Sequence, residues 1–132
     1  MNERALSTLE LGVWTEQACL ETNGQPTLAR ASATQLFRGD IEGEGRLEML
    51  LTYHADGSTS AVGLERVVGR VAGRQGSFVL EHSGCVEEGV AKANFAVVPG
   101  SGTHDLDGLR GRGWFVRHPD RPGALTLHYE FG

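Results

Sequence analysis

Cysteine is scarce in this chain of 132 residues, which contains only Cys19 and Cys85. Two cysteines so far apart fit neither a disulfide framework nor a zinc-binding spacing, and a reduced, cytoplasmic compartment is the simplest interpretation. The chain also lacks an apolar run long enough to span a bilayer. Its first residues, MNERALSTLEL, contain no apolar signal-peptide core. We therefore expect a cytoplasmic protein that does not enter a membrane.

Basic clusters and helical patterns are missing as well. Lys and Arg number 12 against 17 Asp and Glu, which gives a net charge of −5. An acidic chain without a basic patch does not favour a nucleic-acid partner. No segment keeps a helical spacing of apolar residues over several turns. The length of the chain indicates one domain, residues 1–132, with a single core.

Glycine, by contrast, is abundant, and most of the 19 glycines flank short apolar runs, as is typical of turns and bulges between strands. Alternation of apolar and polar residues within these runs predicts β-strands. We expect loops at residues 15–27, which contain Asn-Gly and Pro, and at residues 99–108. The predicted strands cover residues 6–14, 28–38, 41–54, 59–70, 77–83, 86–98, 109–116 and 125–131.

Consecutive strands joined by short turns indicate an antiparallel meander. An open meander leaves two unpaired edges, whereas closure into an up-and-down barrel removes both. We therefore predict an all-β fold, an eight-stranded antiparallel β-barrel with a central cavity, and we keep a β-sandwich as the alternative. A lumen with open space is favoured by small residues that share the predicted inner face, namely Ala61, Gly63, Ala91, Ala93, Gly111 and Gly113.

Two ionisable side chains, Glu65 and His82, lie within predicted strands rather than in turns. His82 shares a strand face with Phe78, and an imidazole among apolar walls can act as a general acid or base. A paired core histidine is the alternative. Glu65 shares its face with small residues. The alternative is a Glu65 on the surface, with Arg66 turned inward. We predict Glu65 and His82 as catalytic residues that share a hydrogen bond or a water.

Four aromatic side chains on apolar strand faces are predicted to contact a substrate: Tyr53, Phe78, Phe95 and Tyr129. Ordinary wall residues are the alternative. Residues 99–103, PGSGT, form either a structural turn or an anion-binding nest. We expect no metal, because no pair of histidines has a zinc-like spacing, and no cofactor.

Four blocks of the chain are similar to a known family: GDIEGEGRLEML, VGLER, GSFVLEHSG and VVPGSGT…LDGLRG. In this order they resemble domain-of-unknown-function family 3224, a bacterial family, over about residues 6–129. That family is grouped with the allene oxide cyclase-like barrels, so the resemblance implies an eight-stranded antiparallel barrel with a central cavity. Glu65, His82 and residues 99–103 keep family motif positions, whereas Cys85 departs from them. The resemblance implies no reaction, because a fold alone does not define one.

The sequence leaves three functions open. The first is a cofactor-free cyclase or isomerase that encloses a small apolar molecule, with Glu65 and His82 managing a proton. The second is a carrier or sensor that binds a small ligand without chemistry. The third is a structural protein with a filled barrel.

Two tryptophans suggest assembly. Trp14 and Trp114 fall on the predicted outer face of the barrel, and exposed tryptophans are typical of subunit contacts. We therefore expect a homo-oligomer, with a dimer favoured over a trimer because two-fold assemblies are the commonest.

Overall fold

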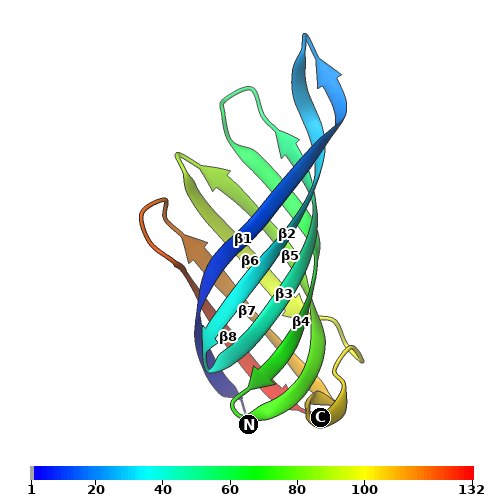
Figure 1. The fold of residues 1–132 in the computed structure, drawn as a ribbon, viewed down its shortest axis with the longest axis vertical. Coiled ribbons are helices and arrows are strands. Elements are labelled where there is room, and N and C mark those ends of the chain that lie inside the picture. The colour runs from blue at the N-terminus through cyan, green and yellow to red at the C-terminus, as the bar shows by residue number, and fades with distance from the viewer. Residues whose placement is uncertain (1) are drawn as a thin grey trace.

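The computed structural model describes residues 2–132 as a closed barrel of eight antiparallel strands (Figure 1). Each strand pairs with its neighbours in sequence, and β1 closes the ring by pairing with β8. The predicted barrel is therefore confirmed, and the β-sandwich alternative is wrong. The strands are β1 (Glu3–Thr22), β2 (Gln25–Gly39), β3 (Ile41–Tyr53), β4 (Thr59–Val71), β5 (Arg74–Glu87), β6 (Val90–Val97), β7 (Leu109–Arg117) and β8 (Gly123–Phe131).

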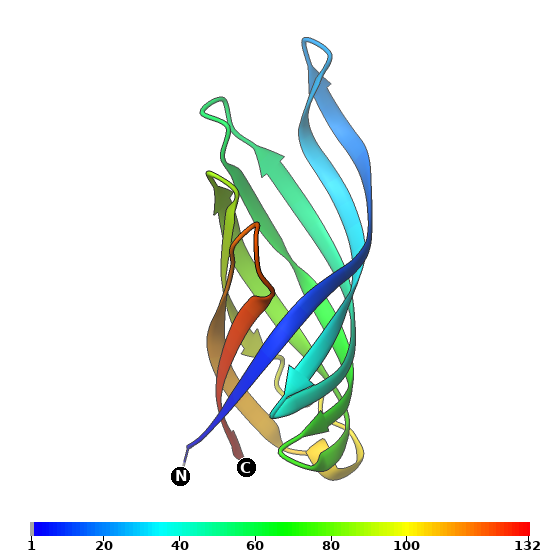
Figure 2. The same ribbon diagram turned by 60° about the vertical axis from the view of Figure 1, so that its left-hand side comes forward.

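The predicted loop at residues 15–27 is wrong, because these residues form the extended end of the β1–β2 hairpin. Only Asn23 and Gly24 separate the two strands, and both adopt positive φ angles (55° and 77°), as a tight hairpin turn requires. This hairpin reaches beyond the other three (Figure 2). Most of its residues are solvent-exposed, so the apolar–polar alternation that marks a half-buried strand is lost there.

The boundary between the fifth and sixth strands is also misplaced by the sequence prediction. β5 continues to Glu87, and the turn falls at Glu88 and Gly89, which both have positive φ. Residue 86 therefore belongs to β5 and not to the sixth strand. The Glu-Gly pair lacks the Asn or Asp that usually signals such a turn.

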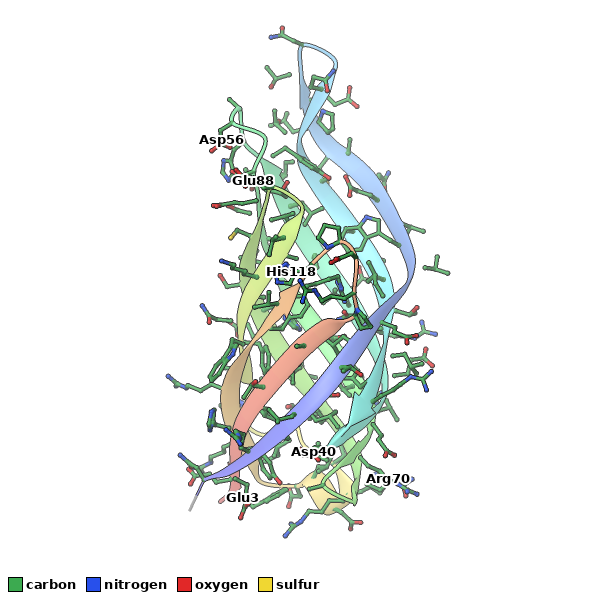
Figure 3. The ribbon with its side chains drawn as sticks, turned by 90° about the vertical axis from the view of Figure 1, so that its left-hand side faces the viewer. Glu3, Asp40, Asp56, Arg70, Glu88 and His118 are labelled. Carbon is green, nitrogen blue, oxygen red and sulfur yellow. The ribbon has the colours of Figure 1, made fainter. Side chains whose placement is uncertain are left out.

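The barrel is filled at one end and open at the other. Glu3, Asp40 and Arg70 lie at the closed end, near both chain termini, whereas Asp56 and Glu88 lie at the tips of open-end hairpins (Figure 3). The closed half is packed with a continuous apolar core that includes Phe37, Ile41, Val67, Phe78, Leu80, Leu109 and Leu127.

The loop between β6 and β7 closes the bottom of the barrel. Its short 3-10 helix, η1 (His104–Leu106), buries Leu106 fully against the core. Two hydroxyls of this loop accept hydrogen bonds from backbone N–H groups of β5: Ser101 Oγ from Val79 at 3.0 Å, and Thr103 Oγ1 from Ser77 at 2.9 Å. β6 ends before it reaches the lower part of β5, so the loop forms hydrogen bonds with that part of β5 instead. These contacts give residues 99–103 a structural role.

Within residues 2–132, no helix is long and apolar enough to cross a membrane.

Candidate functional site

The open half of the barrel contains a cavity of about 260 Å³. Small-molecule sites in proteins typically span roughly 300–1,000 Å³, so this cavity suits a small ligand. Its inward-facing polar side chains are those of Gln35, His82 and Arg117. The remaining wall is largely apolar and includes Leu47, Met49, Leu51, Ala61, Ala93 and Phe115.

A hydrogen-bonded row of polar side chains crosses the lumen between the filled core and the cavity. His82 Nε2, on β5, lies 2.8 Å from Glu65 Oε1, on β4. Gln35 Nε2, on β2, donates to Glu65 Oε2 at 2.8 Å. Arg117 Nη2, on β7, donates to Gln35 Oε1 at 2.8 Å. The order is thus His82, Glu65, Gln35 and Arg117, and this polar row forms the floor of the cavity.

Glu65 is the most deeply buried member of the polar row. Its side chain is 0 % exposed, whereas His82 is 6 % exposed and lines the cavity. Gly45, diagonally opposite Glu65 on the neighbouring strand β3, makes room for the carboxylate, because a Cβ atom there would lie 2.2 Å from Glu65 Oε2. Arg66 faces solvent, so the alternative with Arg66 turned inward is wrong. The predicted hydrogen bond between Glu65 and His82 is confirmed.

The second ring nitrogen of His82, Nδ1, has no hydrogen-bond partner among residues 2–132. No side-chain N or O atom that is fully buried in this part of the chain lacks a partner, so Nδ1 is accessible from the cavity. An ionised carboxylate accepts hydrogen bonds and cannot donate them. When Glu65 is ionised and His82 is neutral, Nε2 therefore carries the proton and Nδ1 presents a lone pair to the cavity.

Gln35 and Arg117 were not among the predicted site residues. A signal for both exists in the sequence, because each interrupts an inward-facing row of apolar or small residues. Gln35 follows Ala31 and Ala33 on β2, and Arg117 follows Phe115 on β7. Burial lowers the pKa of the Arg117 guanidinium, while the negative charge of Glu65 opposes this shift.

The four aromatic residues predicted to contact a substrate lie outside the cavity wall. Phe78 and Tyr129 are packed in the core of the closed half. Phe95 is buried in the same core, with its ring centre 5.7 Å from that of His82. Tyr53 sits at the open rim and donates a hydrogen bond to Glu16. Strand-face alternation predicts which side chains point inward, but not how far along the barrel axis they lie.

Trp14 lines the cavity, which corrects its predicted place on the outer face. A β-bulge between Leu11 and Trp14 shifts the pairing of β1 with β2, so Val13 takes the outward position and is 73 % exposed. Trp114 lies on the outer face as predicted, with its ring centre 5.5 Å from that of His128. The expected homo-oligomer therefore depends on Trp114 alone.

Glu16 connects Trp14 to the rim of the barrel. Its carboxylate accepts a hydrogen bond from Trp14 Nε1 at 3.1 Å and another from the Tyr53 hydroxyl. Burial raises the pKa of Tyr53 from 10.0 to about 12, and the hydrogen bond and negative charge of Glu16 add to the effect. A phenol whose pKa is higher in the folded state stabilises the fold below pH 10, and this contribution is lost as the pH rises from 10 towards 12.

We expect Glu16→Gln to lower the pKa of Tyr53, because it removes the neighbouring negative charge. The chain has two tyrosines, and burial also raises the pKa of Tyr129. Ultraviolet absorbance of the phenolate should therefore show one of two titrations moving to lower pH. Glu21→Gln, an exposed change on the same hairpin, is the control and should leave both titrations in place. Unchanged titrations in Glu16→Gln would contradict the described contact.

The chain is thus a cavity-bearing β-barrel with a buried carboxylate–histidine pair. The family described as "Protein of unknown function (DUF3224)" matches residues 5–129, and the chain belongs to this family. A crystal structure of a DUF3224 protein of unknown function from Shewanella oneidensis MR-1 is similar, with a TM-score of 0.84 and 29% identity over 100% of this chain and 98% of that chain. No curated protein matches. The resemblance inferred from the sequence blocks is thus confirmed.

Proposed function

We propose that the barrel binds a small, largely apolar molecule in its cavity and catalyses a cofactor-independent proton transfer on it, as in a cyclisation or isomerisation. The observation that carries this proposal is the pair of Glu65 and His82, with the free Nδ1 of His82 open to an apolar cavity. His82 is the proposed general base, and Glu65 is the residue that orients it.

The chemistry follows from the arrangement of the pair. A buried carboxylate that accepts from one ring nitrogen fixes the tautomer of the imidazole and stabilises the imidazolium that forms when the other nitrogen takes a proton. Apolar walls around Nδ1 exclude competing water, and charge interactions are stronger in such a medium. The walls also hold an apolar substrate in one conformation, which is the remaining requirement for a proton transfer.

A carrier or sensor is the second candidate, because an apolar cavity is also what a non-catalytic binding protein needs. In that case Glu65 and His82 would only satisfy each other's hydrogen bonds beneath the ligand. Deuterium exchange separates the two functions, because it requires a base and not merely a binding site.

We expect the protein to accelerate exchange of acidic C–H groups in D₂O for members of a panel of small cyclic ketones, measured by NMR. His82→Gln should abolish the acceleration while keeping a donor for Glu65, and His128→Gln, on the outer face, should leave it unchanged. Binding of the ketones without accelerated exchange would favour the carrier. Equal exchange by wild type and His82→Gln would contradict the proposed base.

A further inference from the structure

Arg117 is a cation on the cavity wall without an ionic partner. Its guanidinium has five N–H donors, and one hydrogen bond, to Gln35, is formed within the described chain. No Asp or Glu of residues 2–132 lies within ion-pair distance of it. Both oxygens of the nearest buried carboxylate, Glu65, are already engaged by His82 and Gln35. The remaining donors of Arg117 are therefore available to a ligand.

The surroundings of Arg117 hold its guanidinium in place. The Cζ atom lies 5.1 Å from the ring centre of Phe115, which also lines the cavity. A ring at this distance stabilises a cation, and the bond to Gln35 fixes the other side.

We infer that Arg117 binds an anionic oxygen of the ligand, and that the ligand is a small apolar molecule carrying a carboxylate, or a carbonyl that becomes an enolate. This inference rests on the proposed function. Arg117 and His82 stand at opposite ends of the polar row, so a ligand seated on that floor meets a cation at one end and a base at the other.

A base and an anion-binding group that face one cavity can together remove a proton next to a carbonyl group. The C–H bond breaks, its electron pair forms the C=C bond of an enolate, and the carbonyl electron pair moves onto the oxygen. The proton goes to His82 Nδ1, and the negative charge develops on the oxygen beside Arg117. Where a further C=C bond of the substrate is conjugated with the enolate, the charge extends to the far carbon of that bond, and return of the proton there completes an isomerisation without an oxidant or reductant.

The test compares short aliphatic and aryl carboxylates with their primary amides, which have nearly the same shape but no charge, by isothermal titration calorimetry. We expect the wild-type protein to bind carboxylates at least about tenfold more tightly than the matching amides. Arg117→Gln should remove this preference while leaving amide binding within about twofold, because its amide can still donate to Gln35. Arg121→Gln, an exposed change just beyond β7, should leave the preference intact.

Arg117→Lys provides a second variant, which keeps the charge and should retain most of the preference even if Arg117→Gln folds poorly. Equal binding of acids and amides by wild type, or a preference that survives Arg117→Gln, would overturn the inference. Accelerated ketone exchange in the same wild-type sample would then leave the proposed base standing. If neither acids nor amides bind and no exchange is seen, the proposed function fails together with the inference.

Discussion

Glu65→Gln is expected to reduce the rate of ketone C–H exchange catalysed by His82 by about a hundredfold or more, the usual contribution of a general base. The same variant should change the free energy of unfolding by less than about 1 kcal/mol. Glutamine has the same shape, so its carbonyl can still accept from Gln35 Nε2. Its NH₂ group, however, must donate to His82 Nε2, which then has to be the unprotonated nitrogen. The proton moves to Nδ1, and the lone pair facing the cavity is lost.

Glu65→Ala is the matched comparison for this variant. It leaves the donors on His82 and Gln35 without an acceptor and opens a void, so we expect a loss of roughly 3–5 kcal/mol of stability. Chemical denaturation of both variants, together with the exchange assay, separates the catalytic effect from the structural one. A loss of several kcal/mol in Glu65→Gln itself would show that the pair is a structural ion pair, and not a site whose charge serves catalysis.

Gly45→Ala is expected to disturb the buried pair directly, with a loss of about 2–3 kcal/mol. The new Cβ would lie 2.2 Å from Glu65 Oε2 and 2.9 Å from Phe37 Cε1. Both neighbours are buried and cannot move freely. The carboxylate would be pushed away from His82 or Gln35, so exchange activity should fall as well. Urea denaturation and the exchange assay measure the two effects.

A double-mutant cycle tests whether the carboxylate causes this cost. In a Glu65→Ala background the clashing oxygen is absent, and the added methyl group of Gly45→Ala occupies part of the void. We therefore expect the cost of Gly45→Ala to fall by at least about 1 kcal/mol there. An unchanged cost would assign the strain to Phe37 and not to the fit of Glu65.

Strand alternation predicted the barrel and the inward direction of Glu65 and His82, because a half-buried strand repeats every two residues. The same alternation failed where the repeat is interrupted. At Trp14 a bulge reverses the faces, and in the β1–β2 hairpin solvent on both sides removes the contrast.

The polar row lay beyond sequence prediction for a different reason. Gln35 and Arg117 come from strands distant in sequence, and the register of the closed barrel brings them to one level with Glu65. Height along the barrel axis depends on this register and on the tilt of the strands. Tyr53 and Tyr129 show the same limit, since both face inward but lie above and below the cavity wall.

The proposed function requires His82 to present an unprotonated Nδ1 to the cavity, held there by Glu65. Nitrogen-15 NMR of the imidazole rings measures it directly, with His82 assigned by its loss in His82→Gln. We predict a protonated Nε2 and an unprotonated Nδ1 for neutral His82 in the wild-type protein, and the reverse in Glu65→Gln. A proton on Nδ1 in the neutral wild-type ring, or the same tautomer in both proteins, would contradict it.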